Sequence, residues 1–568
     1  MRFFSPQLAF QLQPNNLHSC TTATASKMLP SLAFSLALAS SVELSLALVL
    51  ETVDFNVTQA LFEQGVNVSA VPALAALTDQ SSVFACSIAC ASLQAVYGDD
   101  AVDLKDEQSY ISFTGSFWSE LQAEVHPQCI FYPSSSSAVS VLVLLSRLTQ
   151  CPFAVKSGGH GAFAGASTIE GGVTVSLRNL NSIALSADRK TAFIKPGNTW
   201  GHIYSELDKH DLSVIGGRVT PIGIGGLTTG GGISFFSNIY GWACDNVASY
   251  EVVTSTGELA TVSPSQHSDL YWALRGGGNN FGIVVEFELE TIPLPGGEMW
   301  GGSRVYTEDQ FPNLIDAFAG LVDESPSDPN AGTWVAWILN SGVKIAAAEI
   351  WYAKPNGQNA SIFDNFNRMP TISDNSGNIT LANFTAQVAE SNPYGYRECY
   401  YATSIRASRA VAQAATDIFY DEVVSVADVA GANPVMVWQG ITKGVLEATK
   451  KNGGNPLGLS VEDGPFYLLQ LSCWWDNDED DAKMYRMIST VLERIKAAAM
   501  AEGVQNDYVY MNYGSQFQDV ISSYGPENKA ALKRIAAKYD PTGVFQKLQP
   551  GYFKLDRAPV PDTDYFSF

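Results

Sequence analysis

Basic side chains are scarce in this sequence. Lys and Arg together number 33 against 57 Asp and Glu over 568 residues, which gives a formal net charge of −24. Neutralising nucleic-acid phosphates requires clustered Lys and Arg, so the charge argues against a nucleic-acid partner. It argues equally against stable association with an anionic membrane surface. Acidic surfaces are common on secreted enzymes, so the charge is compatible with such a protein without being diagnostic of it.

Histidine is rare, and the motifs of common hydrolases are missing. The six histidines lie far apart, at positions 18, 126, 160, 202, 210 and 267. A zinc site needs several ligands close together, so no metal is expected. The sequence contains no G-x-S-x-G turn, no H-E-x-x-H pair and no P-loop. The sequence therefore gives no indication of a zinc site, of these hydrolase motifs or of a P-loop nucleotide site.

Hydrophobic residues, by contrast, are plentiful. They make up 46% of the chain, and aromatic residues make up 11%, so a large core can form and global disorder is excluded. The length allows roughly two to four domains.

The N-terminal region predicts secretion. The apolar run from Leu29 to Leu50 follows Arg2 and Lys27 with no acidic residue before it, which is typical of a signal peptide. Met28 stands where such a leader would begin, so we expect the true start there. A buried hairpin or a membrane anchor is the alternative. Five N-x-S/T sequons agree with secretion, at Asn56, Asn67, Asn359, Asn378 and Asn383.

Eight cysteines suit an oxidising compartment, where some should pair. Cys86 and Cys90 are four residues apart in an apolar, helix-like stretch. We expect one of them, Cys90 in preference, to bridge to Cys129.

The chain changes character along its length. Residues 51–98 look helical, and residues 129–293 form short strands between glycine-rich turns. The segment YEVVTSTGELATVS predicts a hairpin that turns at Thr256 and Gly257. From Gly297 to about Gly503, long strands alternate with amphipathic helices, and the tail ends with the helix PENKAALKRIAAKY. A polar stretch from Pro355 to Phe384 reads as a surface excursion.

Glycine is concentrated in one segment. Eight of the seventeen residues in GGRVTPIGIGGLTTGGG, Gly216 to Gly232, are glycine. Such density costs backbone entropy, which is justified where the chain makes unusual turns or a ligand approaches closely. Backbone N–H groups in a concave loop suit a pyrophosphate. The G-x-G-x-x-G fingerprint fails because Thr228 takes its third place, so a Rossmann fold is disfavoured. Glycine-rich turns without a ligand remain the alternative.

Together with the turn KSGGH, these segments resemble a known family. The matching stretches are FAVKSGGHG, the glycine-rich segment, YGWACDNVASYEVV, DLYWALRGGGNNFGIV, YMNYG and YDPTGVFQKLQPG. They resemble FAD-linked oxidases with the vanillyl-alcohol oxidase fold, in the berberine-bridge-enzyme-like branch common in fungi.

The resemblance implies an α+β fold with a PCMH-type FAD-binding domain split in sequence. We expect a leader over residues 1–50, the FAD-binding domain over 51–296 and 505–568, and an inserted substrate-binding domain over 297–504. The inserted domain should be an antiparallel sheet covered by helices.

The resemblance also implies how FAD is held. His160 corresponds to the histidine that attaches covalently to the flavin. The remaining positions that match cofactor-binding residues of the family are Ser157, Gly158, Gly159, Gly161, Pro221, Gly223, Gly225, Gly226, Thr228, Gly231, Asp245, Val247 and Ile283.

Three positions depart from the family pattern. A second flavin-linking Cys of some relatives is replaced by Val219, so a single histidyl link is expected. Ile233 replaces a Tyr that follows the GGG triplet in some plant relatives. Ile222 occupies the position said to govern oxygen access, which leaves oxidase and dehydrogenase open, with oxygen favoured as the acceptor.

YMNYG supplies the expected catalytic group. The resemblance implies that Tyr513 removes the substrate hydroxyl proton and that Asn512 positions flavin or substrate. Tyr508 and Tyr510 read equally well as core residues. Gln470 and Ser472 share one face of a predicted strand and are candidates for substrate contact, although an ordinary half-buried strand fits them too.

These inferences predict a secreted flavoprotein that moves a hydride from a substrate C–H bond to FAD. The substrate would be an alcohol, sugar or amine, and O2 would be reduced to H2O2. An oxidation or oxidative cyclisation in secondary metabolism is the alternative, and a flavin-binding protein without catalysis is the third possibility.

Overall fold

The computed structural model describes residues 54–75, 85–105 and 107–556, so the predicted leader lies outside the described part of the chain. The first six helices of the described residues lie before or between the strands of a small sheet along the chain. They are α1 (Val57–Glu63), α2 (Pro72–Ala75), α3 (Ala85–Tyr97), α4 (Gln108–Thr114), α5 (Glu120–Ala123) and α6 (Ser136–Thr149). Helix α6 begins after Ser135, whose side chain accepts a hydrogen bond from the backbone N–H of Ala138.

The first sheet has four strands in the order β1-β2-β4-β3. Their bounds are β1 (Val102–Leu104), β2 (Cys129–Phe131), β3 (Phe153–Lys156) and β4 (Val173–Ser176). Strands β2 and β3 both run parallel to β4. The turn Ser157–His160 follows directly after β3, so this sheet carries the KSGGH turn at one of its edges.

Two disulfides tie α3 to the first sheet and its surroundings. Cys90 pairs with Cys129, as expected from the sequence, and Cys86 pairs with Cys151, which the sequence did not reveal. Cys244, Cys399 and Cys473 are free and buried.

The second sheet is antiparallel in the order β5-β6-β10-β8-β9, and β7 also pairs with β10. Its strands are β5 (Ile183–Leu185), β6 (Thr191–Ile194), β7 (Leu212–Val214), β8 (Val247–Val253), β9 (Leu259–Val262) and β10 (Ile283–Pro293). The predicted hairpin is confirmed as β8 and β9, with Gly257 at a φ of 76° in the turn. The accompanying helices are α7 (Trp200–Asp208), α8 (Ile224–Thr229), α9 (Ser237–Tyr240) and α10 (Ser268–Leu274).

The third sheet has nine strands, all antiparallel. They are β11 (Glu298–Thr307), β12 (Ala331–Asn340), β13 (Val343–Tyr352), β14 (Ser373–Asp374), β15 (Gly377–Thr380), β16 (Arg397–Arg406), β17 (Val435–Ile441), β18 (Phe466–Trp475) and β19 (Gln505–Asn506).

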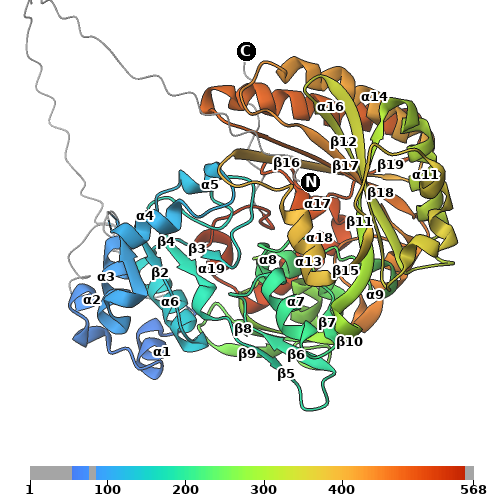
Figure 1. The fold of residues 1–568 in the computed structure, drawn as a ribbon. Helices are drawn as coiled ribbons and strands as arrows, with labels where there is room; N and C mark the ends of the chain where they lie inside the picture. Colours follow the sequence, from blue (N-terminus) through green and yellow to red (C-terminus); the bar gives the residue numbers. More distant parts are fainter. Residues whose placement is uncertain (1–53, 76–84, 106, 557–568) are drawn as a thin grey trace, which may run out of the picture. The chain divides into compact units, whose positions relative to one another are not determined.

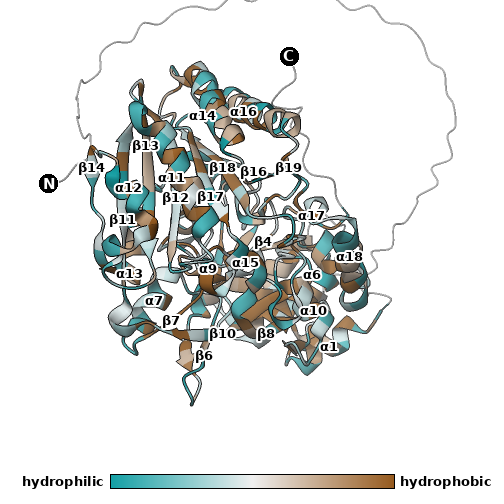
Figure 2. Cartoon of the chain, turned by 90° about the vertical axis from the view of Figure 1, so that its right-hand side faces the viewer, coloured by the Kyte–Doolittle hydropathy of each residue, from teal (hydrophilic) through white to brown (hydrophobic). Residues whose placement is uncertain are grey.

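Three long helices cover one face of this sheet, namely α11 (Phe311–Glu324), α14 (Arg409–Glu422) and α16 (Asp481–Ala501). Brown and teal segments alternate along α14 and α16 in Figure 2, as expected for helices that bury one side. Three shorter helices connect strands of this sheet along the chain, namely α12 (Asp364–Arg368), α13 (Leu381–Ala389) and α15 (Lys443–Ala448).

The C-terminal segment returns to the first two sheets. It contains the short 3-10 turn η14 (Met511–Tyr513), α17 (Val520–Ser523), α18 (Pro526–Tyr539) and α19 (Val544–Lys547). Leu548, just after α19, accepts a hydrogen bond from the N–H of Phe153 at the start of β3, and Figure 1 shows α19 beside this strand. The α+β fold with a split first domain and an inserted, helix-covered antiparallel sheet is therefore confirmed.

None of the helices in the described ranges combines the length and the apolar character that crossing a membrane requires.

Candidate cofactor and substrate site

The two glycine segments touch one another. A Cβ atom built on Gly158 would lie 2.3 Å from the backbone nitrogen of Gly223, and one on Gly223 would lie 2.2 Å from the nitrogen of Gly158. The hydroxyl of Ser157 accepts a hydrogen bond from the N–H of Gly225 and donates one to the carbonyl of Pro196. Glycine at positions 158 and 223 is therefore required by the contact between the two loops.

Other members of these loops leave room for a ligand. A Cβ on Gly226 would meet nothing within 4 Å, and this residue is exposed. The hydroxyl of Thr228 is buried and has no hydrogen-bond partner among the described residues. Open space beside backbone N–H groups and an unused buried hydroxyl fit a dinucleotide such as FAD.

His160 completes the first loop. Its ring lies 4.1 Å from that of Trp118, and its Nε2 is buried without a partner in the described chain. Burial lowers the pKa of His160 to about 4, so the imidazole is neutral at pH 7. A neutral imidazole keeps a lone pair for bonding. These properties suit a histidine that forms a covalent bond to a cofactor.

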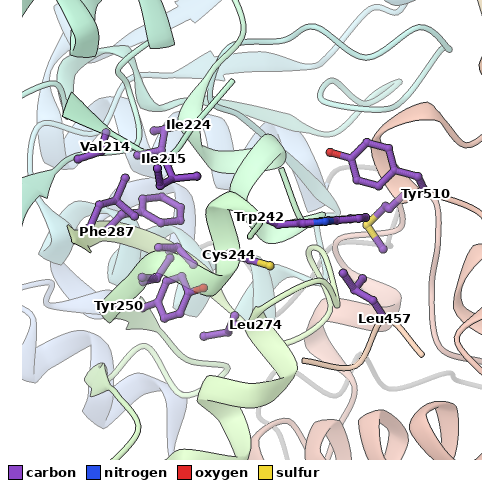
Figure 3. Packing of buried hydrophobic residues seen from close by; sticks show 14 of the residues in the cluster. Val214, Ile215, Ile224, Trp242, Cys244, Tyr250, Leu274, Phe287, Leu457 and Tyr510 are labelled. Atoms are coloured by element: carbon purple, nitrogen blue, oxygen red, sulfur yellow. The ribbon is translucent and has the colours of Figure 1, made fainter. Parts of the chain in front are cut away.

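Tyr510 holds the triple-glycine turn. Its hydroxyl accepts hydrogen bonds from the N–H groups of Gly232 and Ile233 and from Nδ2 of Asn512. Gly231 adopts a φ of 117°, and a Cβ there would lie 2.5 Å from the ring of Trp242. Figure 3 shows Tyr510 beside Trp242, with their ring centroids 5.0 Å apart. Tyr508 and Tyr510 are thus core residues, and Asn512 supports the turn.

Tyr513 has a polar environment. Its phenol oxygen accepts a hydrogen bond from Nη2 of Arg218 at 2.7 Å and another from Nε2 of Gln439 at 3.1 Å. Arg218 also donates to Oε1 of Gln439 at 2.7 Å. Because arginine cannot accept a hydrogen bond, this contact fixes the orientation of the Gln439 amide. Both partners donate to Tyr513, so the phenol's own proton points away from them.

The strand register puts the candidate substrate residues on one face of the third sheet. Gln470 pairs with Ala402 and Val437, and Ser472 pairs with Tyr400. Directly opposed residues of neighbouring strands point to the same side. The ring of Tyr400 lies 6.2 Å from that of Tyr513 and 5.7 Å from that of Trp118. Gln470 and Ser472 therefore lie on the face that carries Tyr400.

The remaining predicted cofactor residues are less concentrated. The carboxylate of Asp245 accepts hydrogen bonds from the N–H of Trp242 and from Nδ2 of Asn455. Val247 pairs with Leu289. Ile283 pairs with Val253 at the other end of the β8–β10 pair. The structure thus gathers the loop residues at 157–161 and 221–231, whereas Val247 and Ile283 lie in the second sheet and Asp245 lies just before β8.

Three residues of the site escaped the sequence analysis: Arg218, Gln439 and Trp118. Arg218 belongs to the glycine-rich segment and directly precedes Val219, so its place in that motif was a usable signal. Gln439 and Trp118 lie in separate segments without a motif, and only the folded chain brings them to Tyr513 and His160.

Comparison with known proteins agrees with this geometry. The FAD binding domain family matches residues 127–263, which include both glycine loops and His160. An FAD-dependent monooxygenase of Fusarium proliferatum is 35% identical over 491 residues, covering 83% of this chain and 94% of the relative. The chain belongs to the family of FAD-linked oxidoreductases.

Other similar proteins extend this picture. The bifunctional solanapyrone synthase of Alternaria solani is 30% identical over 485 residues, 82% of this chain and 89% of that protein. The fold is similar to that of 6-hydroxy-D-nicotine oxidase from Arthrobacter nicotinovorans, with a TM-score of 0.68, 21% identity, and coverage of 80% and 97% of the two chains. It is also similar to that of berberine bridge enzyme, with a TM-score of 0.67, 16% identity, and coverage of 82% and 98%. The resemblance to the vanillyl-alcohol oxidase fold and its berberine-bridge-enzyme-like branch is thereby confirmed, and the chain is an FAD-dependent oxidoreductase.

Proposed function

We propose that this oxidoreductase removes a hydride from a substrate carbon that bears a hydroxyl group, while Tyr513, acting as its phenolate under the two donors from Arg218 and Gln439, receives the hydroxyl proton. A row of aromatic rings carries the proposal. It runs from Tyr513 through Tyr400 and Trp118 to His160, with centroid distances of 6.2, 5.7 and 4.1 Å. A proton acceptor and a flavin-linking histidine at the two ends of one short row can act on the same bound molecule.

The glycine loops and His160 would hold the cofactor. FAD, when bound, supplies the acceptor for the hydride and passes the electrons on to a second acceptor. One covalent link at His160 is supported by Val219, which has no thiol, and by the placement of Cys244. Cys244 is completely buried in the core, and burial raises the pKa of its thiol well above the usual range. Such a thiol is a poor nucleophile.

The protein side chains would orient the substrate and handle its proton. Arg218 and Gln439 hold the oxygen of Tyr513 in place, so that it can face the substrate hydroxyl. Gln470 and Ser472 would contact the substrate from the third sheet, and Asn512 would keep the loop next to Tyr513 in position. We keep the domain boundaries indicated by the sequence as part of the proposal. They are supported by the start of the third sheet at Glu298, although its last strand, β19, ends at Asn506, two residues past the proposed limit at 504.

The proposal also names the electron acceptor and the cellular location of the protein. O2 would reoxidise the cofactor to give H2O2, with Ile222 at the position associated with oxygen access. Secretion is supported by the two disulfides and by the five sequon asparagines, all of which are exposed.

A second candidate function is an oxidation or oxidative cyclisation in the biosynthesis of a small metabolite. It is favoured by the names of similar proteins, which include a solanapyrone synthase and an FAD-dependent monooxygenase. Both candidates share hydride removal, so they differ in substrate and not in the roles of His160 and Tyr513.

Anaerobic titration of the purified flavoprotein with a substrate panel tests the proposal. We expect the visible absorption of the flavin to bleach with at least one compound that carries a C–H bond next to a hydroxyl. Bleaching by oligosaccharides would favour extracellular sugar oxidation, and bleaching only by polyketide- or alkaloid-like alcohols would favour the biosynthetic role. Flavin that stays oxidised with every compound would contradict hydride removal and favour a non-catalytic flavin-binding protein.

A further inference from the structure

Arg218 is a buried cation without an anion beside it. Only 8% of the residue is exposed, and its hydrogen-bond acceptors are Oε1 of Gln439 and the phenol oxygen of Tyr513. Its guanidinium stacks 4.6 Å from the ring of Trp334. Within residues 54–75, 85–105 and 107–556, no carboxylate oxygen lies within 4.0 Å of its nitrogens.

The other buried arginines are differently satisfied. Arg147, Arg304 and Arg397 form ion pairs with Asp54, Asp374 and Asp481, respectively. Arg275 donates to the backbone carbonyls of Lys451 and Asn452. A buried charge without a partner is costly, and proteins keep one where a ligand completes it. Arg218 and Arg275 are thus the two buried arginines of the described chain that form no ion pair, and of these only Arg275 is held by backbone carbonyls instead.

The carboxyl groups on the same face of the third sheet do not balance this charge. Glu349 lies opposite Trp334 in the β12–β13 pair, and Glu398 precedes Tyr400 on β16 by two residues. Burial raises the pKa of Glu349 to about 8 and that of Glu398 to about 10. Both carboxyl groups are therefore predominantly protonated at pH 7, and the face keeps the positive charge of Arg218.

Arg218 also has donors to spare. A guanidinium carries five N–H donors, and Nη2 supplies the two that reach Gln439 and Tyr513. The three N–H groups on Nε and Nη1 have no acceptor among the described residues. Neither nitrogen is fully enclosed by the protein, so both remain accessible to a ligand. Spare donors at the edge of a guanidinium suit a carboxylate or an enolate, which offers two or more lone pairs.

We propose that Arg218 selects substrates that present an ionised acidic oxygen, as a carboxylate or a stabilised enolate, next to the carbon that is oxidised. The inference rests on one part of the proposed function, namely that the substrate binds on the side of the third sheet where Tyr513 lies. The substrate's anion would pair with the free donors of Arg218, while Tyr513 faces the neighbouring hydroxyl. An acidic substrate would thereby supply the negative charge that the folded chain lacks beside Arg218.

Calorimetric titration of the holoenzyme with benzoate and with benzamide tests the proposal. The two probes have the same ring, but only benzoate is charged at pH 7. We expect benzoate to bind the unmodified protein more tightly than benzamide. In Arg218→Met, benzoate binding should weaken by about 10- to 100-fold, the scale of a charge-assisted hydrogen bond. Benzamide should change by about twofold or less, and Arg218→Lys should be intermediate.

A charge-matched control separates a local effect from a general one. Arg409→Met removes a positive charge from the exposed start of α14 and should leave both affinities unchanged. Equal binding of the two probes by the unmodified protein would overturn the proposal, and so would an equal loss for both in Arg218→Met, which would assign Arg218 to positioning Tyr513 alone. If Arg218→Met fails to fold, the proposal is tested by comparing the preference for benzoate over benzamide in the unmodified protein with the same preference in Arg218→Lys. Calorimetry requires no flavin reduction, so failure here is distinct from failure of hydride removal.

Discussion

Tyr510 and Tyr513 are three residues apart and have opposite surroundings. Tyr510 is buried, and its hydroxyl receives three N–H donors from the triple-glycine turn and Asn512. Tyr513 is half-buried, and its hydroxyl meets Arg218 and Gln439. The first arrangement stabilises a loop, and the second is the one expected of the proposed proton acceptor. The two tyrosines of one motif therefore have different surroundings, and we propose different roles for them.

Replacing Tyr513 by Phe tests its role as the base. The ring and its packing remain, so folding and FAD content should be preserved. Flavin reduction in stopped-flow experiments should slow by about 100-fold or more, the usual scale for the loss of such a group. Tyr510→Phe is the matched control, because it should weaken flavin retention and thermal stability by releasing the turn. Near-normal reduction in Tyr513→Phe would move the role to another residue.

Glu398 predicts a pH dependence of stability. Neither of its carboxyl oxygens has a partner among the described residues, and burial raises its pKa to about 10. Between the unfolded pKa near 4.3 and about 10, the folded state binds the additional proton, so stability falls as pH rises. Glu398→Gln removes this penalty. Its stability advantage in denaturant unfolding should grow by up to about 1.4 kcal/mol per pH unit from pH 5 to 8. A constant difference would contradict a buried neutral carboxyl.

The sequence predicted individual site residues only where those residues belong to a short motif of neighbouring positions. His160, the glycine loops and Tyr513 stand in short, dense patterns. Gln439 contacts Tyr513 from a strand 74 residues away in the chain, and Arg218 from 295 residues away. Such pairs arise from the packing of the third sheet against the glycine loops, and no periodicity of the sequence encodes them.

Individual elements were the most predictable level of structure. The amphipathic helices predicted between Gly297 and about Gly503 are confirmed, for example by α16, in which Met484, Met487, Ile488, Val491, Leu492 and Ile495 are buried. The helix PENKAALKRIAAKY is α18 and ends before Asp540. The stretch at 355–384 lies largely at the surface, as expected, but the sequence did not show that it forms β14 and β15, which extend the third sheet beside β11, or that it buries Phe363, Phe366 and Phe384. Short edge strands with polar residues give too weak a period to be recognised.

The glycine loops offer a test of which glycines the cofactor itself requires. The open space beside Gly226 means that Gly226→Ala should fold normally, and alanine is the better helix former within α8. A methyl group there should nevertheless lower the FAD content by obstructing the pyrophosphate. Gly320→Ala in α11 is the control, since its Cβ would also have room, and its FAD content should be unchanged. The check is the flavin-to-protein absorbance ratio, and unaltered flavin in Gly226→Ala would remove this residue from the cofactor site.

At the scale of the whole molecule, the account predicts a secreted glycoprotein. The exposed sequon asparagines and the disulfides support this prediction, while the predicted leader lies in residues that the structure does not describe. N-terminal sequencing of the secreted protein should begin between Ser40 and Phe55, and glycosidase treatment should lower the apparent mass. An intact apolar segment that stays in a membrane fraction would indicate an anchor.

The proposed covalent bond between the flavin and His160 depends on three features of the structure: the split first domain, the neutral imidazole of His160 and the contact between the two glycine loops. Peptide mapping by mass spectrometry of acid-precipitated protein tests it most directly. The account predicts that the precipitate stays yellow, that one peptide containing His160 carries the flavin, and that His160→Ala binds FAD that acid extracts. Flavin attached to Cys244, or flavin that dissociates completely from the unmodified protein, would contradict the account.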